Sequence, residues 1–299
     1  MVFRSKLGAV SNLNWFPGHM ATARKQIQAQ LQNVDLVLEV RDARLPFSSS
    51  NPLLEELCQC KPRLVLFNKA DLANSNLQRK VGDELHKRSN VESIFTMAST
   101  KSKNLKHVIE WCSRHSPAQF QSTGGTVILI MGMPNVGKSS LINHFRRLAT
   151  TTKYSSGRAR ALVGSTPGVT RRTDMIRINE RPALFVIDTP GVMIPKLEST
   201  ELGLDLALTG AIKDSIVGVE VLAEYMLYVL NCRMKSTRYV TSLNLDRPTD
   251  DIEVLFEKVV RKSGGVGKSD DIQRERAAKY LLNEFRMGKF GMFTLDPLP

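Results

Sequence analysis

Short apolar runs separated by amphipathic stretches fill the first two thirds of the chain. This alternation is typical of a parallel β-sheet built from βαβ units. The predicted buried strands are residues 35–40, 63–68, 91–97, 126–132 and 183–188. A more polar run at 172–179 has partly alternating apolar positions and predicts a more exposed strand. The polar stretch 116–125 predicts a linker inside this region.

The pattern changes after Pro195. Apolar residues there recur three and four positions apart without strand-like runs, so we predict helices. The predicted helices are residues 201–214, 218–231, 250–260 and 271–285. The sequence therefore predicts an α/β domain followed by a small all-helical domain. The predicted limits are 1–33 for a basic N-terminal segment and leading helix, 34–196 for the α/β domain and 197–299 for the helical domain.

The net charge changes the picture of what this chain binds. Its formal charge of +13 over 299 residues is larger than solubility alone requires. Such a charge indicates a polyanionic partner such as nucleic acid, and a solvated basic surface is the alternative. No apolar run reaches the roughly 18 residues that cross a bilayer, although peripheral membrane association stays compatible. The four cysteines have no zinc-site spacing and are too few for a disulfide framework.

The N-terminal segment is basic and free of acidic residues. The first carboxylate belongs to Asp35, whereas Arg4, Lys6, Arg24 and Lys25 precede it. An acid-free start that carries Arg, Ser and Asn is typical of a mitochondrial targeting segment. A basic tail on a cytoplasmic protein fits the composition nearly as well.

One glycine-rich loop matches a phosphate-binding pattern in its letters and in its context. Gly132, Gly137, Lys138 and Ser139 fit G-x-x-x-x-G-K-S, between an apolar strand and a helix. The glycines let backbone N–H groups turn toward phosphates, and the helix N-terminus adds its positive dipole end. We expect Lys138 to neutralise the β- and γ-phosphates of a nucleotide and the Ser139 hydroxyl to bind Mg²⁺.

The letters Val-Gly-Lys-Ser occur a second time, at 266–269, without that context. A phosphate loop ending at Gly267 needs a glycine where Lys262 stands. A helical pattern, not a strand, precedes this copy. We therefore predict a connector between two helices, with Ser269 and Asp270 capping the second helix.

A second motif indicates which base the nucleotide carries. Asn68, Lys69 and Asp71 follow the apolar strand 63–68 directly. A carboxylate such as that of Asp71 accepts hydrogen bonds from the N1–H and the exocyclic amine of guanine, and adenine offers neither donor there. A buried acceptor left unpaired by the wrong base discriminates strongly, so the sequence predicts a guanine site.

Two further segments supply candidate metal and γ-phosphate contacts. Asp188 ends a predicted strand, where its carboxylate can reach Mg²⁺ through water, and the Gly191 N–H can contact the γ-phosphate. A proline turn is compatible with the same residues. Thr170 is the candidate switch threonine, whose hydroxyl would complete the metal shell when the γ-phosphate is present.

The order of the motifs is permuted, because the base-reading segment precedes the phosphate loop. This order predicts a P-loop NTPase fold, a Ras-like G domain, with circularly permuted strands. The segments concerned are NWFPGHM (14–20), VRDARLP (40–46), NKAD (68–71), GMPNVGKSS (132–140), TPGVT (166–170) and DTPGV (188–192). Together they resemble the circularly permuted YlqF-type GTPases over residues 15 to about 200.

The resemblance implies activity, cofactors and partners. It implies an enzyme that hydrolyses GTP to GDP and phosphate with Mg²⁺, and that associates with the large ribosomal subunit and its rRNA during maturation. In part of the family this takes place in mitochondria, which implies the matrix or the inner membrane. We expect a monomer.

Carried over by position, the resemblance also implies roles for single residues. The loop residues implied to hold phosphates and Mg²⁺ are Asn135, Val136, Gly137, Lys138, Ser139 and Ser140. Asn135 matches an asparagine that helps hold K⁺ in potassium-stimulated relatives, and a turn-forming role is the alternative. Ala98 and Ser99 would close over the base, although the local sequence departs from the usual Ser-Ala-Lys.

Water positioning needs an unusual device in this chain. Val192 stands where many GTPases carry the glutamine that orients the attacking water. Relatives carry a histidine in the motif that contains His19, which makes His19 the catalytic candidate, and helix capping is its alternative role. We expect slow hydrolysis by the chain alone and faster hydrolysis on the ribosomal subunit.

Two other functions fit parts of the sequence. One is an RNA-binding, GTP-dependent scaffold with little hydrolysis, and the other is a GTPase of tRNA modification or protein targeting. Two basic clusters could meet RNA phosphates or form solvated faces. They are Lys153, Arg158, Arg160, Arg171 and Arg172, and Arg274, Arg276, Lys279, Arg286 and Lys289.

Overall fold

The computed structural model describes residues 28–97, 104–117, 124–151, 175–188, 197, 199–262 and 270–298. Contacts between Cα atoms divide the chain into two compact units. The α/β unit comprises the described residues of Pro17–Ala70 and Asn76–Pro195. The helical unit comprises Asp71–Ser75 and the described residues of Lys196–Pro297. The predicted domain limits stay a prediction.

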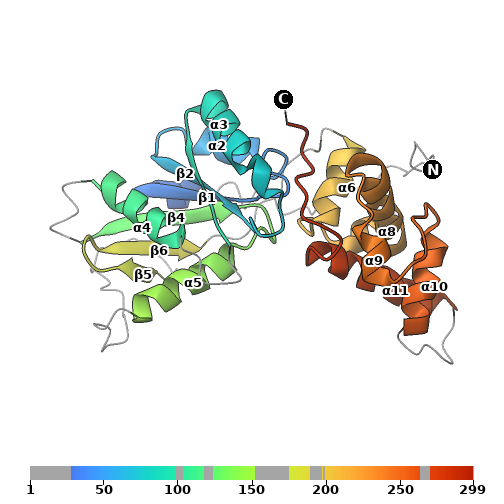
Figure 1. Ribbon diagram of the computed structural model, residues 1–299. Helices are drawn as coiled ribbons and strands as arrows, with labels where there is room; N and C mark the ends of the chain where they lie inside the picture. Colours follow the sequence, from blue (N-terminus) through green and yellow to red (C-terminus); the bar gives the residue numbers. More distant parts are fainter. Residues whose placement is uncertain are drawn as a thin grey trace. The chain divides into compact units, whose positions relative to one another are not determined.

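The α/β unit is built on one six-stranded sheet (Figure 1). In chain order the strands are β1 Leu36–Asp42, β2 Arg63–Asn68, β3 Glu92–Phe95, β4 Thr126–Gly132, β5 Ile176–Asn179 and β6 Leu184–Asp188. They lie side by side as β3-β2-β1-β4-β6-β5, and every neighbouring pair is parallel except β5 with β6. The permuted P-loop fold predicted from the motif order is thereby confirmed.

Burial explains why the central strands are mostly apolar. Every residue of β1 is buried, and successive side chains of a strand point to opposite faces, so both faces of the sheet are covered. The covering helices are α2 Pro52–Leu57, α3 Gln78–Ser89, α4 Asn104–His115 and α5 Lys138–Thr151, with a short 3₁₀ turn η1 at Ser75–Leu77. Both α3 and α4 contact β3, whereas α5 contacts β4, β5 and β6.

The helical unit is centred on α8, which contacts α6, α7, α10 and α11. Its elements are α6 Thr200–Leu208, α7 Asp214–Val217, α8 Val219–Tyr228, the π-helical turn η3 Val229–Arg233, α9 Arg238–Leu243, α10 Ile252–Lys262 and α11 Asp270–Arg286. The predicted helix at 201–214 ends early, at Leu208, and a separate short helix begins at Asp214. Gly210 has a φ of +87°, which an α-helix cannot accommodate, so α6 ends before it. None of the described helices is long and apolar enough to cross a membrane.

The segment Asp71–Ser75 follows β2 in the chain yet packs with the helical unit. Within that unit, the backbone N–H of Phe293 donates to the carbonyl of Leu72 at 3.1 Å. The tail that follows α11 is thus fastened to the segment that begins with Asp71.

Candidate nucleotide-binding site

The glycine-rich loop lies between β4 and α5, as its sequence predicts. Gly132 and Gly137 have φ angles of +147° and +97°. A Cβ atom on Gly132 would lie 2.2 Å from the carbonyl oxygen of Val40, and one on Gly137 would lie 2.2 Å from Asn68 Nδ2. Only glycine allows this close approach, so the two glycines let the loop pack against β1 and the end of β2.

Lys138 begins α5, and its side chain turns back over the loop. Its ammonium donates to the carbonyls of Met133 and Gly132 at 2.8 and 3.2 Å. The residue is 7% exposed, so the charge lies within the ring formed by the loop. Ser139 and Ser140 are exposed in the first turn of α5. A helix N-terminus with a lysine inside the preceding loop suits the phosphates of a nucleotide.

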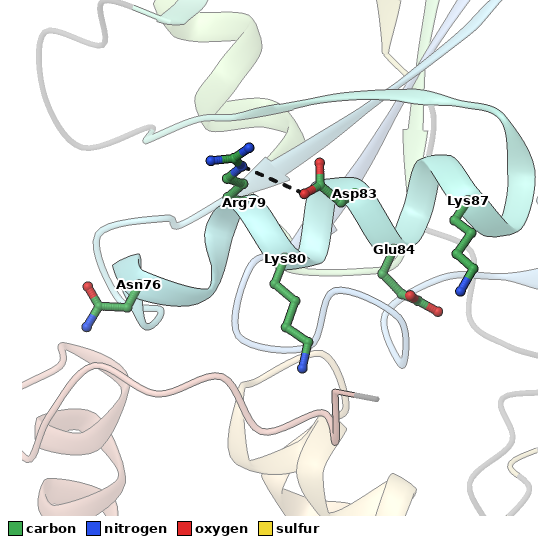
Figure 2. Close-up of a pocket in the computed structure, with 6 residues that line it drawn as sticks. All are labelled: Asn76, Arg79, Lys80, Asp83, Glu84 and Lys87. Atoms are coloured by element: carbon green, nitrogen blue, oxygen red, sulfur yellow. Dashed lines mark ion pairs between the residues drawn. The ribbon is translucent and has the colours of Figure 1, made fainter.

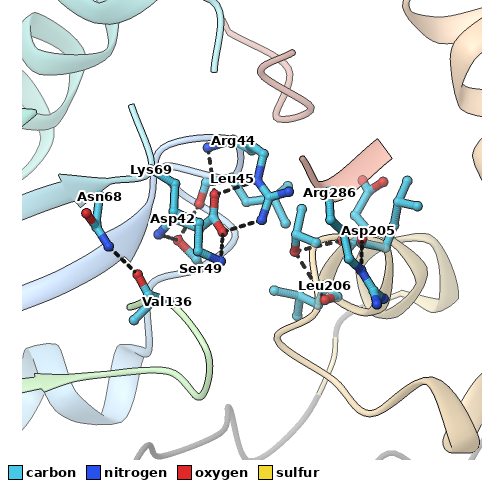
Figure 3. Close-up of polar contacts among 12 residues, drawn as sticks. Asp42, Arg44, Leu45, Ser49, Asn68, Lys69, Val136, Asp205, Leu206 and Arg286 are labelled. Carbon is cyan, nitrogen blue, oxygen red and sulfur yellow. Dashed lines mark hydrogen bonds and ion pairs between the residues drawn. The ribbon is translucent and has the colours of Figure 1, made fainter. Parts of the chain in front are cut away.

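Asn68 joins the base-reading segment to the phosphate loop. Its side-chain amide donates to the carbonyl of Val136 at 2.8 Å (Figure 3). Its side-chain oxygen accepts from the Thr96 hydroxyl at 3.3 Å. The residue is fully buried. The ends of β2, β3 and β4 therefore meet through one amide, although residues 68 and 136 are far apart in the chain.

Lys69 and Asp71 complete the base-reading motif in different surroundings. Lys69 has a φ of +59°, and its ammonium lies 2.9 Å from Asp42 Oδ2. Asp71 is exposed, and it belongs to the segment that packs with the helical unit.

Asp42 contacts the base-reading motif, and sequence reasoning assigned it no role. Its carboxylate accepts from Arg44 Nε at 2.9 Å and from Arg44 Nη2 at 2.7 Å, besides its ion pair with Lys69. Burial alone would raise the pKa of this carboxyl, but the Arg44 guanidinium and the Lys69 ammonium hold it well below its usual range. A signal was present in the sequence, because the charged run Arg-Asp-Ala-Arg (41–44) directly follows a buried strand.

Several predicted site residues lie outside the described residues. These are His19, Ala98, Ser99, Thr170 and Gly191. Asp188 is the last residue of β6, and its backbone pairs with Ile130 of β4, two residues before the phosphate loop begins. Its side chain is not among the described groups.

A metal ion at this loop would take part of its ligands from the nucleotide. Among the residues that the structure describes, no three His, Cys, Asp or Glu side chains gather to hold a metal ion. Mg²⁺ keeps several waters and is commonly bound by one or two protein groups together with substrate phosphates. The exposed Ser139 hydroxyl beside the loop fits that arrangement.

A hollow on α3 is unrelated to these motifs. It has a volume of about 370 Å³ and is lined by Asn76, Arg79, Lys80, Asp83, Glu84 and Lys87 (Figure 2). Its lining carries charges of both signs, and Arg79 Nε lies 3.9 Å from Asp83 Oδ2. No lining residue belongs to a nucleotide motif, so this hollow is not the nucleotide site.

Comparison with known proteins agrees with this geometry. Residues 127–252 match the family described as 50S ribosome-binding GTPase. Mitochondrial ribosome-associated GTPase 1 of Mus musculus is 41% identical over 94% of this chain and 89% of its own length. The protein of the same name from Xenopus tropicalis is 38% identical over 95% of this chain and 94% of its own.

More distant relatives extend the same picture. Ribosome biogenesis GTPase A of Bacillus cereus is 33% identical over 95% of this chain and 93% of its own length. The structure of GNP-bound YlqF from T. maritima superposes with a TM-score of 0.59 at 23% identity, covering 92% of this chain and 97% of that one. Its GDP-bound form gives 0.57. On its motifs, its permuted sheet and these relatives, the chain belongs to the circularly permuted YlqF-type GTPases, the family of mitochondrial ribosome-associated GTPase 1.

Proposed function

We propose that this GTPase binds the large ribosomal subunit in mitochondria and promotes its maturation, and thereby regulates mitochondrial translation. The names of its relatives support the ribosome as partner and mitochondria as the compartment. The observation that carries the nucleotide part is the 2.8 Å bond from Asn68 to the phosphate loop, because it joins the two halves of a guanine nucleotide site.

The proposed roles follow the motifs. Asn68, Lys69 and Asp71 bind guanine, and Ala98 and Ser99 close over it. Ser139, Thr170 and Asp188 hold Mg²⁺ with the phosphates, and the Gly191 N–H contacts the γ-phosphate. The residues proposed to hold phosphates are Asn135, Val136, Gly137, Lys138, Ser139 and Ser140. Asn135, with a φ of +57°, turns the loop and is proposed to help bind K⁺.

Hydrolysis is proposed to depend on the ribosomal subunit. Val192 offers no polar group to orient water, and His19 is the proposed substitute. We expect the subunit to stabilise the arrangement in which His19 reaches the attacking water. Hydrolysis by the free protein is then slow.

Ion pairing bears on where rRNA binds. Four of the five basic residues in the second predicted cluster form ion pairs within the helical unit, and Lys289 among them lies just after α11, which ends at Arg286. These pairs are Arg274 with Glu253, Lys279 with Glu275, Arg286 with Asp214 and Lys289 with Glu284. This partial neutralisation favours the other cluster, around Arg158 and Arg171, as the rRNA contact; that cluster lies outside the described residues.

The proposal is tested by measuring GTP turnover with and without large ribosomal subunits, in K⁺ and in Na⁺. We expect at least about tenfold stimulation by large subunits, since partner-supplied groups accelerate related GTPases far more, and a further gain in K⁺. Small subunits and the Lys138→Ala variant are the controls. Equal turnover with and without large subunits would contradict the assembly-factor role; GTP-dependent rRNA binding without turnover would support the scaffold alternative.

Location and oligomeric state have their own tests. We propose residence in the matrix, with peripheral attachment to the inner membrane, and a monomeric state. Carbonate extraction of fractionated mitochondria and light scattering of the purified protein measure these. Release with the soluble matrix fraction before carbonate treatment would contradict attachment, and a mass of twice 33.4 kDa would contradict the monomer.

A further inference from the structure

Lys69 holds an uncommon backbone conformation in the middle of the base-reading motif. Its φ of +59° places it in the left-handed region, where side chains that carry a Cβ are rare. Such a conformation persists only when the surroundings enforce it, and it is concentrated at functional sites. The contacts around Lys69 therefore show what enforces it.

The backbone is fastened on both sides of Lys69. The carbonyl of Asn68 accepts a hydrogen bond from the Ala43 N–H at 2.8 Å, and the Ala70 N–H donates to the carbonyl of Thr96 at 3.1 Å. The side chain is fastened separately, because its ammonium pairs with Asp42 Oδ2 at 2.9 Å. Ala43 and Asp42 are neighbours, so the end of β1 holds both the backbone and the side chain of this motif.

Asp42 is itself rigidly held. Arg44 binds both carboxylate oxygens, and the backbone N–H of Asp42 donates to the Ser49 hydroxyl at 3.0 Å. The carboxylate is only 4% exposed. Because this buried carboxylate is held in place, it restricts the Lys69 ammonium to one position, and the rest of the lysine side chain is restricted with it (Figure 3).

We propose that Asp42 is a positioning residue that sets the affinity for guanine nucleotides by fixing Lys69, without touching the nucleotide. This inference rests on the guanine site proposed at Asn68, Lys69 and Asp71. Loss of the ion pair lets Lys69 leave its enforced conformation, and the base-reading segment 68–71 is then held less firmly. The expected result is faster nucleotide release, with little change in the rate of hydrolysis at saturating GTP.

A neighbouring ion pair on β1 provides a matched control. Glu39 Oε1 lies 2.7 Å from Arg41 Nε, and both side chains are 2% exposed. Arg41 also pairs with Glu55 of α2, so this pair is connected to a helix and not to a nucleotide motif. Glu39→Gln therefore removes a buried charge from the same strand without releasing Lys69, and should lower the melting temperature alone.

The experiment measures dissociation of fluorescent mant-GDP from the full chain carrying Asp42→Asn, Lys69→Met, both substitutions or Glu39→Gln. We expect the dissociation rate to rise about tenfold in Asp42→Asn and in Lys69→Met. Because the two residues are coupled neighbours, the double variant should show no further rise. Glu39→Gln should stay within about twofold of wild type, because it is not coupled to the site. The kcat of Asp42→Asn at saturating GTP should change by less than about threefold, since the variant is expected to act on binding.

Other results would overturn the proposal. An unchanged dissociation rate in Asp42→Asn would show that Asp42 acts only on stability. A dissociation rate in the double variant that equals the product of the two single increases would show that Asp42 does not act through Lys69. If Asp42→Asn does not fold, Lys69→Met decides, because it keeps the stem and removes the ion pair; an unchanged rate then overturns the proposal. Asp71→Asn distinguishes failure of this proposal from failure of the guanine site. If Asp71→Asn and Lys69→Met each bind mant-GDP as tightly as wild type, the guanine site itself is contradicted.

Discussion

Asp42 and Asp205 are buried carboxylates in different units, and each is paired with an arginine. Asp205 accepts from Arg233 Nη1 at 2.8 and 3.0 Å and from the Tyr225 hydroxyl at 2.8 Å. Burial outweighs these partners and raises the pKa of Asp205, whereas two cations lower that of Asp42. Similar geometry thus gives opposite electrostatic results, because Asp42 has two cations of its own.

The two networks also end on different parts of the molecule. Asp42 leads to Lys69 in the base-reading motif. Arg233, beyond Asp205, donates to the carbonyl of Leu295, and so holds the C-terminal tail to α6 and α8. Our proposal assigns the first network to nucleotide binding, whereas the contacts of the second lie within the packing of the helical unit. Substitutions in the two units should therefore separate nucleotide affinity from stability.

The strongest contrast is expected between the two Val-Gly-Lys-Ser copies. Lys138→Ala removes the buried ammonium from the phosphate loop, and we expect at least about a hundredfold loss of GTP affinity. Lys268→Ala, in the copy outside the described residues, should change affinity less than twofold. Titration calorimetry with a non-hydrolysable GTP analogue measures both. Equal losses would show that the second copy also binds nucleotide.

Base preference gives the next largest effect. Asp71→Asn replaces an acceptor pair by one acceptor and one donor, which suits xanthine, whose C2 oxygen replaces the guanine amine. We expect guanine affinity to fall about a hundredfold or more and xanthine affinity to rise. Competition of GTP and XTP for mant-GDP release provides the measurement. A variant that keeps its guanine preference would place base reading elsewhere.

In the helical unit, Asp205→Asn should act on stability alone. It removes the closer carboxylate of Arg233, which is half-buried and keeps Glu201 at 3.4 Å, so we expect a cost of about 2 kcal/mol in free energy of unfolding. Tyr225→Phe removes one neutral donor and should cost about 1 kcal/mol. Urea unfolding measures both, and mant-GDP affinity should stay at the wild-type value. A loss of affinity in Asp205→Asn at temperatures where it is folded would contradict the separation of the two networks.

The opposite pKa shifts predict opposite pH dependences. The lowered pKa of Asp42 gives stability that is complete above its unfolded pKa of about 4 and is lost as pH falls through the folded value. The raised pKa of Asp205 gives stability that is complete below about pH 4 and is lost as pH rises through the folded value. Urea unfolding from about pH 2.5 to 7.5 should therefore show two changes in the free energy of unfolding. The gap between wild type and Asp42→Asn should narrow below about pH 4, and the gap between wild type and Asp205→Asn should widen as the pH falls toward about 4. Parallel curves would contradict the assignment.

The smallest effect is expected on the surface of α11. Lys279 pairs with Glu275 one helical turn away, and both side chains are more than half exposed. Exposed ion pairs of this kind contribute little to stability. Lys279→Ala should therefore leave the melting temperature and the affinity for the large ribosomal subunit unchanged. A clear decrease in subunit binding by this variant would instead indicate an rRNA contact on α11.

Much of the fold could be predicted because its signals are local. Five strands, the phosphate loop and the permuted order follow from apolar runs and short motifs, although β3 is less buried than the other four. The ion pair of Asp42 could not be predicted, because it depends on Lys69 reaching across from the end of the next strand. The ion pairs of Arg274 and Arg286 escaped prediction for the same reason, since their partners lie on other helices. Sequence shows which charges a helix carries, and only the fold shows which of them are neutralised.

The strand order also has a consequence for synthesis of the chain. β1 pairs with β2 on one side and with β4 on the other, and β4 is made after β1, β2 and β3. While the chain grows from its N-terminus, one edge of β1 has no strand beside it, and that edge carries fully buried Leu36 and Val37 in the finished protein. Open apolar edges recruit strands from other chains. The permutation therefore leaves the centre of the sheet open until β4 is made, and a nascent chain released before then would be prone to aggregate.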